Sequence, residues 1–225
     1  MLPSTGLIKK TSLRLFRIVF PLSLKVIPGG LKKYDASFFA GMTGLSTKML
    51  LRYESKYPDS MKTMIKHLKS YTSEKQRYSK VSNMIILNAE KYMILDKYFF
   101  DDPVIITAGF VQLTASVFVP PNPKKDFLEE DIQEYIEKIP CPDKVVFLKS
   151  SPETCLKRMK KRSKGYPYTY HELTEKNMLK RLKDCNACFE VAVEHLNSMD
   201  VDVIEIDAEK PIKEIIEDIE SKVNF

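Results

Sequence analysis

The sequence predicts an α/β protein, with a parallel sheet flanked by helices. In the second half of the 225-residue chain, short apolar runs rich in β-branched residues alternate with longer stretches of helical periodicity. Because strand, helix and strand follow one another in this order, crossover helices should join parallel strands. The length favours a single α/β domain over residues 1–225, carrying an insertion, rather than two independent units.

Three apolar runs supply the expected strands. Residues 103–106 (PVII) follow an Asp-Asp step, residues 145–148 (VVFL) follow CPDK, and residues 201–207 read VDVIEID. Continuous runs of this kind are typical of strands that a parallel sheet buries on both faces.

A helix is expected directly after the second strand, over residues 152–162 (PETCLKRMKKR). Pro152 suits the first helical position, with Ser150 or Ser151 as the cap. Glu153 lies in the first turn, where the helix dipole favours an anion. The segment therefore has a clear helix start at the end of a strand.

Three further stretches are predicted to be helical. Residues 172–198 and 211–223 both place apolar residues at helical spacing. Residues 36–98 have no comparable strand signal and carry lysine-rich faces such as MKTMIKHLKSY, which predicts a mainly helical insertion beside the sheet.

The net charge of +6 arises at the N-terminus. Residues 1–34 contain seven Lys or Arg residues and no acidic residue, whereas the rest of the chain is nearly neutral. The rest of the chain shows no basic stripe of the kind that would indicate a nucleic-acid site. The basic segment also has the composition of a transit peptide or of a helix that contacts an anionic membrane surface. Its longest uncharged run, residues 18–24, is far short of the ~20 residues that span a bilayer.

The four cysteines, Cys141, Cys155, Cys185 and Cys188, are too few and too irregular for a disulfide scaffold. They favour a reducing compartment, so the expected location is cytoplasmic, with organelle targeting through the basic N-terminus as the alternative. Zinc would need two more ligands beside the Cys-x-x-Cys pair, so free thiols are expected.

A degenerate phosphate-binding loop stands near the start. The pattern G-x-x-x-x-G-K-[ST] laid over residues 4–11 (STGLIKKT) matches Lys10 and Thr11, while Ser4 and Lys9 replace both glycines. Side chains at those positions disfavour the backbone curl that presents amides to a phosphate. The stretch is therefore either a degenerate nucleotide-binding site or a basic segment that contains KKT by chance.

The second candidate for phosphate chemistry follows the strand 145–148. Ligands bind beyond the carboxyl ends of strands in open parallel sheets, where residues 150–165 begin. The helix expected within it ends in five basic residues, Lys157, Arg158, Lys160, Lys161 and Arg162. A basic segment that closes on a transferring phosphoryl group has this character. The alternative is a solvated basic helix end favoured by the dipole.

The order of elements over residues 103–222 resembles the second half of P-loop nucleoside and nucleotide kinases of the thymidylate-kinase-like type. The resemblance implies a three-layer P-loop sandwich and phosphoryl transfer from Mg²⁺ and ATP, or another NTP, to a nucleoside, nucleotide or similar small acceptor. It assigns Lys10, Arg158 and Arg162 to catalysis and Asp207 to the adenine side. The nucleotide-binding candidates are Lys9, Lys10, Thr11, Ser12 and Lys161, with Thr11 also on the Mg²⁺ side.

The chain departs from this family at the end of the strand 103–106. Acidic residues usually stand there, but this chain has Thr107 and Ala108, neither of which serves as a general base near neutral pH. Gly109 and Gln112 remain acceptor-side candidates. No first strand fits before the degenerate loop. These departures indicate either an N-terminally incomplete chain or a catalytically inactive kinase fold with a binding or regulatory role.

Overall fold

The structure is a computed structural model that describes residues 47–98, 106, 109–163, 165–166, 170 and 173–223. All of these residues belong to one compact unit, Thr47–Phe225. In this part of the chain, no helix combines the length and the apolar character that crossing a membrane requires.

Two parallel strands, β1 (Lys144–Lys149) and β2 (Asp202–Asp207), form the sheet of the described residues. Their register places Lys144 opposite Asp202 and Lys149 opposite Asp207. The chain crosses between them through two helices, α7 (Pro152–Lys160) and α8 (Glu175–Ser198). This parallel pair agrees with the predicted α/β class. The predicted strand 103–106 lies outside the described residues except for Ile106, which has no regular secondary structure.

Helix α7 begins where the sequence predicts. The Ser151 hydroxyl accepts a hydrogen bond from the Thr154 amide at 3.2 Å, and Pro152 occupies the first helical position. The helix ends at Lys160, two residues before the predicted end. The Lys161 amide bonds instead to the Arg158 carbonyl in a tighter turn, at 3.2 Å.

The start of α8 also differs from the prediction. The Thr174 hydroxyl accepts a hydrogen bond from the Asn177 amide at 3.3 Å and so caps the helix at its N-terminus. Leu173 therefore precedes the helix. The last predicted helix is α9 (Ile212–Lys222), which Pro211 precedes.

A helical group occupies the chain before β1. It consists of the helical residues 47–56 and of α3 (Ser60–Tyr71), α4 (Lys75–Tyr98), α5 (Phe110–Phe118) and α6 (Glu129–Lys138). Helices α5 and α6 were not predicted from the sequence. The signal for α6 was present, because Glu129, Glu130 and Asp131 fill its first turn and Lys138 its last, as the helix dipole favours.

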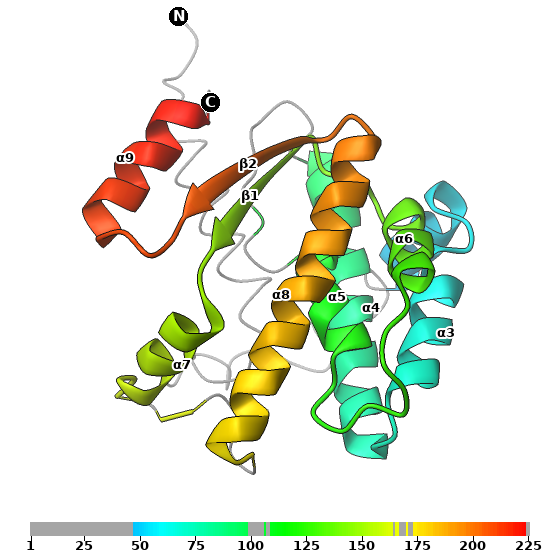
Figure 1. The fold of residues 1–225 in the computed structure, drawn as a ribbon. Coiled ribbons are helices and arrows are strands. Elements are labelled where there is room, and N and C mark those ends of the chain that lie inside the picture. Colours follow the sequence, from blue (N-terminus) through cyan, green and yellow to red (C-terminus); the bar gives the residue numbers. More distant parts are fainter. Residues whose placement is uncertain are drawn as a thin grey trace, which may run out of the picture. The chain divides into compact units, whose positions relative to one another are not determined.

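The main core lies among α3, α4, α5, α6 and α8. The Phe118 ring is at its centre, with its centroid 5.0 Å from that of Tyr71 and 5.6 Å from that of Tyr135, both edge-on. Helix α8 packs on this group and on β2, while α9 packs on β2, as Figure 1 shows. A smaller cluster of Leu156, Tyr170, Met178 and Leu182 holds α7 against the start of α8.

The prediction that the strand 145–148 is fully buried was wrong. The Val146 and Leu148 side chains are 38% and 51% exposed. Among the described residues β1 has a strand partner on one edge only, so one face and one edge are less covered than in a wide parallel sheet. Ile212 of α9 is likewise 77% exposed, although it lies on the apolar stripe that predicted this helix.

A candidate site at the carboxyl ends of the strands

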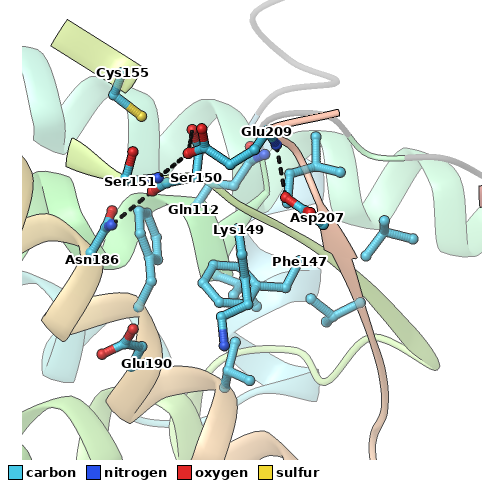
Figure 2. A pocket seen from close by; sticks show the side chains of 16 residues that line it. Gln112, Phe147, Lys149, Ser150, Ser151, Cys155, Asn186, Glu190, Asp207 and Glu209 are labelled. Atoms are coloured by element: carbon cyan, nitrogen blue, oxygen red, sulfur yellow. Dashed lines mark hydrogen bonds between the residues drawn. The ribbon is translucent and has the colours of Figure 1, made fainter. Parts of the chain in front are cut away.

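A cleft of about 660 Å³ runs along β1 to the ends of both strands (Figure 2). It lies where open parallel sheets bind their ligands. Its lining consists of Val111, Gln112, residues 145–151, Cys155, Asn186, Phe189, Glu190, Val193, Asp207 and Glu209.

The apolar part of the cleft lies along the edge of β1. The Phe147 and Phe189 ring centroids are 6.5 Å apart, so a strand residue and an α8 residue together form part of its wall. Within the described residues this edge of β1 has no strand partner. The polar side chains line the other end of the cleft, which is the part suited to a polar ligand.

The Glu209 carboxylate organises the polar end. One oxygen accepts hydrogen bonds from the Ser151 amide at 2.6 Å and from the Ser150 hydroxyl at 3.1 Å. The other accepts from the Thr154 hydroxyl at 2.6 Å. These bonds, the one from Thr154 first, lower the pKa of Glu209 to about 2. An anion thus occupies the N-terminus of α7, where free amides and the helix dipole favour one.

The loop after β2 is tied to the surrounding elements. The Ala208 amide donates to the Lys149 carbonyl at 2.8 Å, and the Glu209 amide donates to the Asp207 carboxylate at 2.8 Å. Arg158 of α7 donates from Nη2 to the Ala208 carbonyl at 2.6 Å. Hydrogen bonds therefore tie the loop after β2 both to the end of β1 and to α7.

Helix α8 supplies the third wall of the polar end. The Asn186 side-chain amide donates to the Ser150 carbonyl at 3.0 Å, which fixes the turn between β1 and α7. Figure 2 shows Asn186 directed toward Ser150 and Glu209 directed toward Ser151. The lining there combines an amide, two hydroxyls and two carboxylates within one cleft.

The predicted site residues fall into different places. Arg158 contacts the loop beside the cleft, and Gln112 lines the cleft with an exposed side chain. Lys161 and Arg162 follow the end of α7, are exposed and do not line the cleft. Gly165 then turns the chain with φ of 69°, in the left-handed region that favours glycine.

Gly109 immediately precedes α5. A Cβ at this position would lie 3.2 Å from Ile106 Cγ2, so the close approach favours glycine. The predictions for Lys9, Lys10, Thr11, Ser12, Thr107 and Ala108 concern residues outside the described part of the chain.

No sequence pattern predicted a role for the central carboxylate, Glu209. Its signal was an acidic residue two positions after Asp207, at the end of the last strand. Thr154 and Asn186 were also missed, because a threonine in a first helical turn and an asparagine in a long helix are unremarkable without knowledge of what they face.

The four cysteines are free, as expected. Cys155 lines the cleft and is half-buried. Burial raises the pKa of the Cys185 and Cys188 thiols, so both remain protonated near neutral pH.

Comparison with known proteins relates the segment that carries this site to one family. Residues 112–219 match the family model described as thymidylate kinase. The match confirms the predicted resemblance: this segment, just under half of the chain, is similar to thymidylate-kinase-like kinases. It contains both strands, α7, α8 and the whole polar end of the cleft. No curated protein and no solved structure matches the chain.

Proposed function

We propose that the protein is a P-loop kinase that transfers a phosphoryl group from Mg²⁺-bound ATP, or another NTP, to a nucleoside, a nucleotide or a similar small acceptor. The observation that carries the proposal is the family match over residues 112–219, which spans the polar cleft at the strand ends. In the proposal, the parallel pair belongs to a wider sheet in a three-layer sandwich.

The described residues support the nucleotide part of this proposal through the loop at residues 207–209. Arg158 and Lys149 hold its backbone at the Ala208 carbonyl and amide. A loop fixed in this way presents a constant surface to a base, and the Asn186 amide lies on the facing wall. Preorganisation of this kind lowers the entropy cost of binding.

The part of the proposal that concerns phosphate binding rests on basic side chains. Lys161 and Arg162 are exposed after α7, and their side chains have no ion-pair or hydrogen-bond partner within the described residues, so they are available to contact the donor phosphates. The residues proposed to complete the donor site are Lys9, Lys10, Thr11 and Ser12. Phosphoryl transfer depends mainly on positioning and on neutralising charge, which such residues supply.

The cleft fits a nucleotide better than it fits a metal. Among the described residues it holds no cluster of three metal-ligating side chains, and Asp207 and Glu209 are engaged in hydrogen bonds. Mg²⁺ is bound in many kinases by few protein ligands together with substrate phosphates. In this proposal, Thr11 and the donor phosphates would hold it, and Mg²⁺ would neutralise the developing charge.

A second function, that of an inactive kinase fold with a binding or regulatory role, is favoured by one observation. Thr107 and Ala108 stand where the family usually has acidic residues, so no general base is provided there. Such a protein would bind a nucleotide without turning it over.

Transfer of labelled γ-phosphate from Mg²⁺-ATP to a panel of nucleosides and nucleoside monophosphates tests the proposal. Kinase function predicts a labelled acceptor whose formation requires Mg²⁺ and decreases in Arg162→Ala. The exposed α9 variant Lys213→Ala is the matched control and should retain full transfer. If no acceptor is labelled while the nucleotide still binds, the second function is correct, and the protein binds a nucleotide without transferring its phosphate.

A further inference from the structure

A second cluster of ionisable side chains lies between α3 and α6, and shares no residue with the cleft. His67 projects from α3, while Asp131 and Glu134 are three residues apart on one face of α6. His67 Nδ1 is 3.8 Å from Asp131 Oδ1, and His67 Nε2 is 3.0 Å from Glu134 Oε2. The ring therefore has a carboxylate at each nitrogen.

His67 is buried, with 1% of its surface exposed, and its ring packs 5.3 Å from the ring of Phe118. Its Nε2 makes no hydrogen bond of good donor–acceptor geometry, although Glu134 Oε2 lies 3.0 Å away. A buried polar atom without a hydrogen bond costs free energy, and is uncommon unless a ligand or water satisfies it.

The two carboxylates create a conflict for a neutral ring. A neutral imidazole has one N–H and one lone pair, whereas a carboxylate only accepts hydrogen bonds. One nitrogen must therefore direct its lone pair toward a carboxylate oxygen. A cation bound between that nitrogen and the carboxylate oxygen removes the conflict, because it accepts an electron pair from each of them.

We propose that His67, Asp131 and Glu134 bind a divalent transition metal of the Zn²⁺ class. Their ligand atoms all lie within 4.8 Å of one another. Zn²⁺ binds nitrogen and oxygen ligands at about 2.0–2.2 Å, so small side-chain rotations bring all three into contact. An imidazole combined with carboxylates favours Zn²⁺ over Mg²⁺ or Ca²⁺, which prefer oxygen ligands alone.

The neighbouring donors leave one Asp131 oxygen open, whereas at Glu134 the ion would replace a lysine. Tyr71 and Lys125 both donate to Asp131 Oδ2, which leaves Oδ1 directed toward His67. Lys66 contacts both oxygens of Glu134, at 2.9 and 2.8 Å. The Lys66 and Lys125 side chains are 57% and 43% exposed, so both can move into solvent when a metal takes their place.

The site would fasten α3 to α6. These helices belong to the group that builds the main core, and the ion would bridge residues 64 or more positions apart in the chain. A ligand that binds only the folded protein stabilises it by mass action. Metal binding is therefore expected to raise the melting temperature, independently of whether the cleft binds nucleotides.

Calorimetric titration of the full chain with Zn²⁺, paired with thermal melts, tests this proposal. The expected result is saturable binding with one ion at this site and a melting temperature that rises with Zn²⁺ and falls back on chelation. Glu134→Gln and His67→Gln should each weaken this binding about tenfold or more, since each removes one of three ligands.

The control is Glu137→Gln, which alters the next turn of the same helix. Glu137 lies 3.3 Å from His195 and takes no part in the proposed site, so this variant should bind Zn²⁺ as the wild type does. Because Glu134 is 37% exposed, Glu134→Gln keeps the test meaningful even where the buried His67→Gln fails to fold. Absence of saturable binding, or wild-type affinity in Glu134→Gln, would overturn the proposal.

A Co²⁺ absorption spectrum separates this site from the free cysteines. Nitrogen and oxygen ligands give weak visible bands, while thiolates add intense ultraviolet charge-transfer bands. The proposal predicts a spectrum without thiolate bands. A thiolate spectrum that survives Glu134→Gln would place the ion on cysteines and contradict the assignment.

Discussion

The Thr154 hydroxyl donates to the Glu209 carboxylate at 2.6 Å, and this hydrogen bond joins the first turn of α7 to the loop after β2. The two residues are 55 positions apart. The bond fixes the basic helix relative to the loop after β2, and these two elements form two of the walls of the proposed nucleotide site.

Acid should weaken this connection. The pKa of Glu209 falls from 4.5 to about 2 in the folded protein, because the bonds from Thr154 and Ser151 favour the carboxylate. A depressed pKa adds stability that is full above the unfolded pKa and is lost as the pH falls toward 2. Urea unfolding from pH 6 to pH 2.5 should show wild type and Glu209→Gln converging in acid. A stability difference that does not change with pH would refute this.

Loss of the cap on α7 should destabilise the protein. Ser151→Ala removes the hydroxyl that accepts from the Thr154 amide, and N-cap serines contribute about 1 kcal/mol. Thr174→Ala removes the equivalent cap of α8 and should have a similar effect. Urea unfolding measures both. If Ser151→Ala is neutral, the Glu209 carboxylate alone satisfies this helix end.

Tyr135 tests the main core. Its hydroxyl is fully buried and donates to the Phe110 carbonyl at 2.9 Å. Tyr135→Phe should lower the free energy of unfolding by about 1 kcal/mol, since it leaves a buried carbonyl without its donor. Tyr78→Phe is the matched control, because the Tyr78 hydroxyl has no hydrogen-bond partner among the described residues. Equal effects of both changes would mean that this bond contributes nothing.

Arg158 and Arg162 should differ in their effects. Arg158→Ala loses the bond to the Ala208 carbonyl, so it should reduce stability together with nucleotide affinity. Arg162 is exposed, and Arg162→Ala should leave stability within about 0.5 kcal/mol of wild type while lowering phosphoryl transfer. Thermal melts combined with transfer assays separate the two. A loss of stability in Arg162→Ala would assign it a structural role.

The sequence predicted the elements whose signals are local. β1 and β2 are short apolar runs, and α7 has a serine cap followed by Pro152, so both kinds of element are visible within a few residues. Helix α5 was missed because FVQLTASVF is apolar over most of its nine residues, and such a run does not distinguish a buried helix from a strand.

The candidate site depends on contacts that sequence spacing does not reveal. Arg158 was predicted from its position after a strand, but its bond to Ala208 crosses 50 positions. Glu209 and His67 have no motif around them, and each acquires a role only when another helix or loop packs beside it. The exposure of Leu148 was unpredictable for the same reason, because it depends on which strands adjoin β1.

Titration with a fluorescent ATP analogue, with and without Mg²⁺, tests most directly whether the strand-end cleft belongs to a nucleotide site. The proposed function predicts saturable, Mg²⁺-dependent binding that Lys10→Ala and Arg162→Ala weaken, while Lys213→Ala on α9 binds as the wild type does. Absence of saturable binding, or equal affinity in all of these variants, would contradict it.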